Sequence, residues 1–535
     1  MDKLKRLKLL LGKGFLPENM PPPFHTRDLA KFAGALSKAF VHPLKPPKTR
    51  YQRYSIARLG DSRRNLAIVN PVAQFYLSKE IADNWIKIRA FLKKTSMSIT
   101  SPDLTDGDEH ERSILTTDFS ALDFRKLEIS SAHDYVLFSD ISRFYPTLYT
   151  HVIPWALNGK QWSKVNLNTA AYKNTLGSRL DAFVRRTQED QTIGIPIGPD
   201  TSRILSEIVA VGAEEQLYHL LSRRLEGAAR HVDDMTIGAS TLAEAEQIRF
   251  CLERSLDFYE LQINPDKTRI TTSASFHEAT WPYEIKKFEF GASLSEQRVA
   301  IEHFFHRAFE LSEKHRKDNV LNYAIKRSKS IIVYKRNWPL YETFLIKAAR
   351  SNGTCLPTVV QIFASYRRLG YALNEAALHK FISDSISRHA PVGHHGELAW
   401  TLFLAKAVGI TIPKKAVAPV YDVDCSACSL LALDLDSMGR IEGGLDKSRW
   451  AALLTLDNLN SDMWLLAYEA DLKGWLNAPT PGFVNAHDHF SHLRKHKISF
   501  YDTTKNVMSI KKEKKLFWAH FKQEFARALA SSASG

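Results

Sequence analysis

The chain of 535 residues carries 73 lysines and arginines against 58 aspartates and glutamates, a formal net charge of +15. With 44% hydrophobic and 24% charged residues, the composition is that of a globular protein and excludes wholesale disorder. No apolar run approaches the roughly 18 residues of a membrane span, and four cysteines are too few for a disulfide framework. We therefore expect a cytoplasmic, reduced protein with no membrane partner.

The positive charge is concentrated in three segments. Residues 1–13 carry a net charge of +4, and residues 42–64 and 491–515 carry +6 each, which leaves the rest of the chain close to neutral. Clustered positive charge favours a polyanionic partner such as nucleic acid. The alternative is three solvated basic surfaces.

Two early segments predict irregular structure. Residues 17–24 (PENMPPPF) are rich in proline and are expected to be extended. Residues 98–120 are polar and acidic, which is typical of a loop or an exposed hairpin.

From residue 134 to residue 272, strand and helix patterns alternate. The predicted elements are a strand at 135–138, a helix at 201–226, a hairpin around Asp233 and Asp234, a helix at 241–260 and a strand at 268–272. This order is that of a βαββαβ split fold in the α+β class.

Beyond residue 300, helical patterns separated by proline and glycine dominate. The predicted helices are 301–313, 340–350, 357–369, 374–388, 396–408, 448–456 and 461–475. Trp400 and Trp464 each begin a similar apolar helical face, which indicates a helical repeat array. The alternative is an ordinary helical domain with two buried tryptophans.

Carboxylates end two apolar segments of the split fold. Asp140 follows the strand at 135–138, and Asp233 and Asp234 lie in the hairpin turn. A buried carboxylate must be paired or bound to metal, and two adjacent aspartates repel each other unless a cation is present. Nucleotidyl transfer uses such carboxylates to hold two divalent ions, with Mg²⁺ expected and Mn²⁺ as a substitute. An ordinary aspartate-rich turn is the alternative.

Five segments resemble reverse transcriptase motifs, in the right order. Residues 138–146 (FSDISRFYP) resemble motif A, 194–202 (GIPIGPDTS) motif B, 231–234 (HVDD) motif C and 264–268 (NPDKT) motif D. Residues 64–71 (RNLAIVNP) resemble a segment of the fingers. The resemblance implies a right-hand polymerase with fingers and a βαββαβ palm.

Within this class, the sequence is most similar to bacterial abortive-infection and defence-associated reverse transcriptases. Residues 14–24 (GFLPENMPPPF) resemble their N-terminal segment, and motif B has Ile197 where retroviral and intron enzymes usually have glutamine. The resemblance implies a fingers and palm domain at 1–295, an all-α, HEAT-like repeat domain at 296–535 and a role in antiviral defence.

The resemblance also assigns roles around the metal ions. Asp140 and Asp233 would be the principal metal ligands, Asp234 a ligand or supporting carboxylate, and the backbone carbonyl of Ile141 a further ligand. Lys267 would protonate or stabilise the leaving pyrophosphate. An exposed turn lysine is the alternative for Lys267.

Substrate contacts follow from the same motifs. Tyr145 matches the aromatic residue that rejects a 2′-hydroxyl and so selects dNTPs. Arg58, Arg63 and Arg64 are candidates for the triphosphate or a nucleic-acid backbone, with a solvated edge strand as the alternative. The motif B residues expected at the templating pair are Gly194, Pro196, Gly198 and Ser202, although Ser202 could equally be a helix N-cap.

Three functions remain open at this stage. The first is a reverse transcriptase that copies an RNA, for instance a non-coding RNA partner, into DNA. The second is an untemplated, protein-primed DNA polymerase, and the third is a nucleic-acid-binding scaffold with a vestigial palm. The resemblance implies a homo-oligomer, a trimer or hexamer, and tyrosines such as Tyr421, Tyr468 and Tyr501 as candidate primers.

Two smaller clusters are expected to have no metal. Cys425 and Cys428 have the spacing of a metal knuckle but no second pair, so we expect free thiols. Four histidines in the basic C-terminal segment are expected to contact nucleic acid or solvent rather than metal: His487, His489, His492 and His496.

Overall fold

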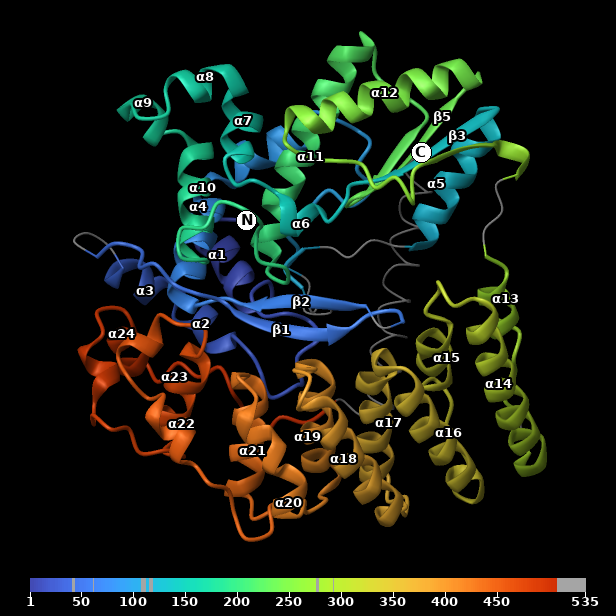
Figure 1. Ribbon diagram of the computed structural model, residues 1–535, viewed down its shortest axis with the longest axis vertical. Coiled ribbons are helices and arrows are strands. Elements are labelled where there is room, and N and C mark those ends of the chain that lie inside the picture. The colour runs from blue at the N-terminus through green and yellow to red at the C-terminus, as the bar shows by residue number, and fades with distance from the viewer. Residues whose placement is uncertain are drawn as a thin grey trace.

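The computed structural model describes residues 1–40, 44–60, 62–106, 112–114, 119–275, 279–291 and 293–507. It is an α+β fold, mainly helical, with a two-stranded and a four-stranded antiparallel sheet among the described residues. In Figure 1 the two-stranded hairpin crosses the middle of the molecule, with the larger sheet above it and a row of helices below it. The α+β class expected from the sequence is confirmed.

The N-terminal part consists of three helices, the hairpin and a long helix. Their bounds are α1 (Lys3–Gly12), α2 (Arg27–Lys31), α3 (Ala33–Ala39), β1 (Gln52–Ala57), β2 (Arg63–Ile68) and α4 (Pro71–Leu92). The side chain of Asn70 accepts a hydrogen bond from the Val72 amide, and Pro71 occupies the first position of α4. This cap and the fixed φ of proline start α4 directly after β2.

The four-stranded sheet has the strand order β4-β5-β3-β6. Its strands and the helices between them are β3 (Tyr135–Asp140), α11 (Asp200–Leu221), β4 (Ala228–His231), β5 (Asp234–Ala239), α12 (Leu242–Phe258) and β6 (Arg269–Thr272). This is the βαββαβ order expected from the sequence. Helix α5 (Phe119–Ala132) and α12 both pack against the sheet (Figure 1).

A helical insertion separates β3 from α11. It comprises α6 (Phe144–Thr147), α7 (Val152–Asn158), α8 (Lys160–Val165), α9 (Ala170–Lys173) and α10 (Leu176–Arg186). Helices α7 and α10 pack against each other and against α11 and α4, respectively, and so join the sheet region to the N-terminal helices.

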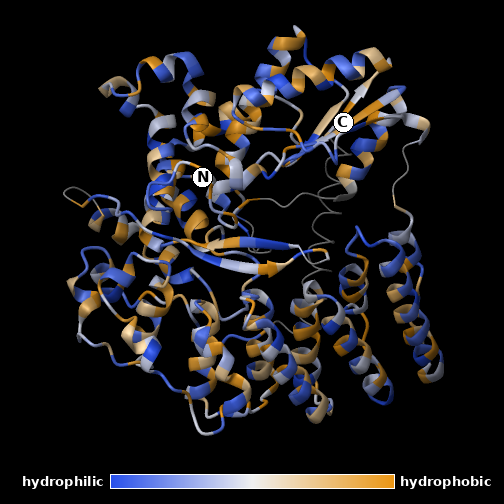
Figure 2. Cartoon of the chain, in the orientation of Figure 1, coloured by the Kyte–Doolittle hydropathy of each residue, from blue (hydrophilic) through white to orange (hydrophobic). Residues whose placement is uncertain are grey.

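The row of helices in the C-terminal half begins before residue 296. Its α-helices are α13 (Trp281–Lys286), α14 (Leu294–Lys314), α15 (Val320–Ser328), α16 (Trp338–Ser351), α17 (Leu356–Arg368), α18 (Glu375–His389), α19 (His395–Val408), α20 (Lys414–Val417), α21 (Ser426–Ser437), α22 (Ser448–Ala452), α23 (Trp464–Lys473) and α24 (Phe490–Lys495). All seven predicted helices are present; the helices that were not predicted are α13, α15, α20, α21 and α24. Figure 2 shows apolar and polar segments alternating along these helices, as in amphipathic helices.

The two halves share one hydrophobic core and hold each other at several points. The indole of Trp400 donates to the Asn19 carbonyl, and Phe24 forms a β-bridge with Tyr501. The Ser293 and Glu296 capping box opens α14, so the expected boundary at 295/296 falls in its first turn. That boundary stays a prediction.

The expectations for irregular segments are met in part. Residues 17–24 contain no helix, but they form two turns, closed by hydrogen bonds from the Met20 amide to the Pro17 carbonyl and from the Phe24 amide to the Pro21 carbonyl, instead of an extended segment. In the 98–120 segment Leu104 pairs with Ile114, and α5 already begins at Phe119. Residues 107–111 and 115–118 of that segment, and residues 508–515 of the last basic segment, lie outside the described residues.

Candidate functional site

Strand register brings the three predicted aspartates together. Asp140, at the end of β3, pairs with Asp234, the first residue of β5. The amide of Ile141 donates to the carbonyl of Asp233 at 3.1 Å. The three carboxylates offer oxygens that all lie within 4.8 Å of one another. We call this group of Asp140, Asp233 and Asp234 the carboxylate pocket; whether the Ile141 carbonyl binds metal stays a prediction.

The turn that carries Asp233 is strained and braced by a buried arginine. Val232 has a φ of +59°, which is unfavourable for a β-branched residue. The fully buried Arg230 donates to the Val232 carbonyl at 2.9 Å. Its guanidinium also pairs with Glu207 and Glu214 of α11. Sequence analysis missed this triad, although a charged residue inside the apolar strand β4 was a usable signal.

The carboxylate pocket concentrates negative charge. Loss of hydration raises the pKa of Asp233, and repulsion from Asp140 adds to the effect. Loss of hydration, a hydrogen bond with Asp140 and repulsion from Asp233 raise the pKa of Asp234 to about 6. Lost hydration and mutual repulsion therefore both oppose ionisation of Asp233 and Asp234, and a cation at the pocket would relieve that repulsion.

Lys267 supplies positive charge to this pocket. Its Nζ lies 2.6 Å from an oxygen of Asp140 and 3.9 Å from Asp234. Partial burial lowers the pKa of Lys267, but the attraction of Asp140 and the other two aspartates outweighs it, so the net shift is upward. The Asn264 side chain donates to the other oxygen of Asp140 at 3.2 Å. The turn expected from motif D therefore lies against the motif A aspartate.

A pocket of about 240 Å³ opens beside the aspartates. Asp140, Asp234, Lys267 and His231 contribute to its wall. A larger pocket of about 940 Å³ lies between α13 and α14, away from the carboxylates, and is shallow and open. The smaller pocket is the candidate site because the cluster of three carboxylates borders it.

Two predicted substrate residues lie within electrostatic range of the carboxylate pocket: Arg64 and Tyr145 both interact with Asp233. Burial lowers the pKa of Arg64 and raises that of Tyr145 to about 12. The Ser206 hydroxyl donates to the Tyr145 hydroxyl at 3.1 Å and fixes the ring beside the pocket.

Arg63 points to a different region. Its guanidinium forms a two-pronged ion pair with Glu397 of α19, with Nη2 at 2.8 Å from Oε2. Successive side chains of a strand point to opposite sides, so Arg63 and Arg64 of β2 serve different neighbours. Arg63 was a candidate for the triphosphate or a nucleic-acid backbone; in this structure its guanidinium pairs with Glu397 of the helical half.

The glycines expected from motif B occur where the backbone requires them. Gly194 has a φ of +81°, and a Cβ there would lie 3.0 Å from the Pro146 carbonyl oxygen. Gly198 has a φ of +132°. Pro196 is buried between them. The Ile197 carbonyl accepts from the Ala67 amide of β2 at 2.8 Å, which ties this loop to the hairpin.

Ser202 is not the N-cap that the sequence allowed. Pro199 holds the N-cap position of α11, and Ser202 is buried inside the first turn. The N-terminal segment packs against the same loop: the Asp200 amide donates to the Gly14 carbonyl, and Arg112 pairs with Asp200. A Cβ on Gly14 would collide with Ser113 and Asp200, which explains a glycine there.

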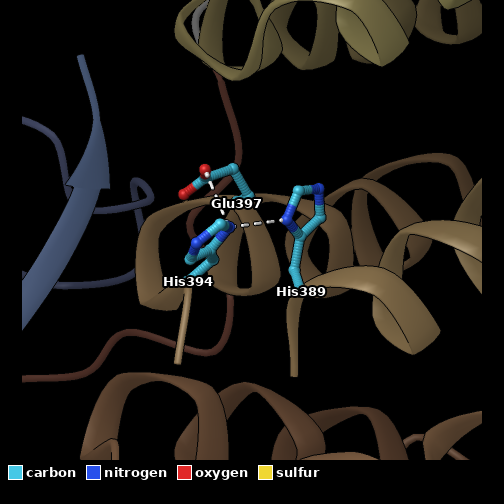
Figure 3. Close-up of side chains that lie close together, drawn as sticks. All are labelled: His389, His394 and Glu397. Carbon is cyan, nitrogen blue, oxygen red and sulfur yellow. Dashed lines mark hydrogen bonds and ion pairs between the residues drawn. The ribbon is translucent and has the colours of Figure 1, made fainter. Parts of the chain in front are cut away.

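A second cluster, absent from the sequence expectations, lies at the corner between α18 and α19. His389 ends α18, His394 precedes α19, and Glu397 is in its first turn. The two Nδ1 atoms are 3.1 Å apart, and His394 Nδ1 is 3.7 Å from Glu397 Oε1 (Figure 3). We call these three residues the histidine corner. The spacing His-x4-His-x2-Glu was the available signal.

The C-terminal histidines correct one expectation. His487 and His489 are buried, so they do not contact nucleic acid or solvent. The ring of His489 packs edge-on against Phe40 and lies 3.2 Å from the Tyr76 hydroxyl, and burial lowers its pKa to about 4. His496 stacks on Phe32.

The thiols and two of the named tyrosines are also buried. Cys425 and Cys428 form no disulfide and are fully buried. Tyr468 and Tyr501 are buried, with hydroxyls bonded to the Ile498 carbonyl and the Asp434 carboxylate. Neither hydroxyl is accessible as a primer in this structure.

The sequence matches no model of a known protein family and no curated protein. Within the described parts of the chain, no helix combines the length and apolar character needed to cross a membrane.

Proposed function

We propose that this protein is a divalent-metal-dependent nucleotidyltransferase of the reverse transcriptase type, which makes DNA from dNTPs on an RNA template. The observation that carries the proposal is the convergence of three carboxylates, from β3 and from the β4–β5 turn, within 4.8 Å. The clustered carboxylates repel one another, and aspartates that served only in a turn would have this cost without any benefit.

The donor set fits a hard divalent cation. All the converging side chains of the carboxylate pocket offer oxygen, which Mg²⁺ and Mn²⁺ prefer. The Lys267 ammonium beside Asp140 already balances part of the charge. Asp140 and Asp233 would hold the ions, with Asp234 at the exposed rim as a ligand or support.

The chemistry follows from these positions. Bound Mg²⁺ would activate a primer 3′-hydroxyl and neutralise the leaving pyrophosphate. Lys267 lies close enough to the pocket to donate a proton to the leaving oxygen, after release from Asp140. Arg64 would position the triphosphate, and the Tyr145 ring would exclude a 2′-hydroxyl.

The surrounding architecture is assigned on the same basis. We assign the four-stranded sheet as the palm, the β1–β2 hairpin as part of the fingers and the C-terminal helices as a HEAT-like array. The hydrogen bond from Asp200 to Gly14 and the close approach of Pro17 to Gly198 support a role for the N-terminal segment in shaping the template side. Antiviral defence and assembly as a homo-oligomer are parts of this proposal that rest on the resemblance.

The test is incorporation of labelled dNTPs by the full chain. Asp233→Asn together with Asp234→Asn should abolish incorporation, whereas Asp266→Asn, an exposed aspartate in the neighbouring turn, should leave it unchanged. Equal incorporation by the wild type and the double variant would make the enzyme proposal wrong and favour a nucleic-acid-binding scaffold.

Nuclease treatment tests the template. Product should disappear when bound nucleic acid is digested before the assay and return when RNA is added. Long polymer attached to nuclease-treated protein would instead identify an untemplated, protein-primed polymerase that uses the same aspartates.

A further inference from the structure

The histidine corner has the geometry of a metal site. Two ligands on one tetrahedral ion, with bonds of about 2.0 to 2.1 Å, lie about 3.3 Å apart. The Nδ1 atoms of His389 and His394 are 3.1 Å apart, and Glu397 Oε1 is 3.7 Å from His394 Nδ1. Figure 3 shows the three side chains converging from the end of α18 and the start of α19.

The protonation state also suits a ligand set. Metal-binding histidine must be neutral, with a free lone pair on the ligating nitrogen. Burial lowers the pKa of His389 to about 4 and also lowers the pKa of His394. Burial therefore disfavours the charged form of both rings, and a metal ion would replace the proton that the two Nδ1 atoms share in their hydrogen bond. Arg63 lowers the pKa of the buried Glu397 carboxylate.

We propose that His389, His394 and Glu397 form a second metal site, selective for Zn²⁺ or a similar borderline transition-metal ion. Two imidazoles and one carboxylate select such ions over Mg²⁺, which prefers oxygen donors only. The side chain of His394 is 31% exposed, so water can take the fourth position from the solvent side.

Arg63 makes this site part of the connection between the two halves. A carboxylate has about four lone-pair positions, so Glu397 Oε1 can accept from Arg63 and bind a metal ion together. A hydrogen-bond donor that contacts a metal-binding side chain fixes the orientation of that side chain. The positive guanidinium also weakens cation binding, so we expect lower affinity than in an isolated site with the same ligands. The bound ion would clamp α18 and α19 onto β2.

The experiment is a titration of the metal-free full chain with Co²⁺, a visible probe for zinc sites, followed by displacement with Zn²⁺. To exclude binding at the carboxylate pocket, the background carries Asp233→Asn and Asp234→Asn. We expect a Co²⁺ absorption band of four-coordinate type that Zn²⁺ removes and millimolar Mg²⁺ does not. His389→Ala and His394→Ala should each weaken binding at least about tenfold.

Two further variants separate ligation from folding. His379→Ala removes an exposed histidine from α18 and should leave the affinity unchanged. His389→Cys should restore binding with a new sulfur-to-cobalt absorption band, because thiolate is also a zinc ligand. The proposal is overturned if no Co²⁺ binds, if both alanine variants bind as tightly as their background, or if His379→Ala weakens binding as much as they do.

Discussion

The carboxylate pocket and the histidine corner each interact with an arginine of strand β2, but they offer different ligand atoms. The first has carboxylate oxygens alone, and the second has two imidazoles and one carboxylate. Arg64 interacts electrostatically with Asp233 of the carboxylate pocket, and Arg63 pairs with Glu397 of the histidine corner. The pocket is assembled by the register of β3, β4 and β5, whereas the corner is assembled by the turn between two helices. Adjacent residues of β2 therefore interact with two separate clusters of side chains.

The largest expected effect is the loss of nucleotide incorporation when Asp140 of the carboxylate pocket is replaced. Asp140→Asn should reduce nucleotide incorporation at least about a thousandfold, or ~4 kcal/mol in activation free energy, because it removes a metal ligand. Co²⁺ binding at the histidine corner should be unaffected in the same variant. Single-nucleotide incorporation and Co²⁺ absorption measure the two effects, and a parallel loss of both would show that the regions are not independent.

Arg230 tests whether the turn of the carboxylate pocket must be braced. Arg230→Met should lower the free energy of unfolding by about 3 kcal/mol or more, because Glu207 and Glu214 stay buried without their partner. Adding Glu207→Gln and Glu214→Gln should recover most of this stability in urea unfolding.

Incorporation by the triple variant should nevertheless stay low, because the hydrogen bond to the Val232 carbonyl is still missing. Recovery of both stability and incorporation would limit Arg230 to a role in folding.

Variants of the two adjacent arginines of β2 allow a direct comparison of the two regions. Arg64→Ala should raise the KM for dNTPs about tenfold, or ~1.4 kcal/mol, with little change in stability. Arg63→Ala should leave KM within about twofold but lower the free energy of unfolding by about 1 to 3 kcal/mol, because the buried Glu397 loses its partner. Steady-state kinetics and urea unfolding of both variants measure these effects. A raised KM in Arg63→Ala together with lost stability in Arg64→Ala would refute the assigned roles of the two arginines.

His489 is a histidine that packs in the core, in contrast to the two that form the histidine corner. Its pKa is lowered to about 4 by burial, whereas in the unfolded chain it titrates near 6.5. The unfolded state therefore binds the proton first, so this contribution to stability is complete above about pH 6.5 and is lost as the pH falls towards 4.

Between pH 7 and pH 5, the wild type should consequently lose about 1 to 2 kcal/mol more unfolding free energy than His489→Gln. Urea unfolding at both pH values measures the difference, with His379→Gln as a control at an exposed histidine. Equal losses in the wild type and His489→Gln would show that this ring is not held neutral by packing.

The sequence predicts the order of the sheet region because its signals are local. The apolar run at 135–138 and the aspartates at strand ends mark β3 and the β4–β5 turn without knowledge of the partners. Most helices of the C-terminal half are predicted for the same reason. Helix α21 is missed because it is apolar on all sides in the core and so has no amphipathic period.

The remaining features depend on partners that are distant in the chain. Alternation along β2 implies that Arg63 and Arg64 face opposite sides, but only the docked α19 reveals Glu397 as the partner of Arg63. His489 lies next to a basic segment typical of a solvated surface, yet Phe40 and Tyr76 pack against its ring. The histidine corner likewise exists only once α18 and α19 meet.

The account rests on the carboxylate pocket binding divalent cations, and Mn²⁺ binding tests this most directly. Electron paramagnetic resonance should detect Mn²⁺ bound to the full chain in the presence of a dNTP, displaced by Mg²⁺ and weakened at least about tenfold by Asp140→Asn. Mn²⁺ affinity that is the same in the wild type and in Asp140→Asn would contradict the account.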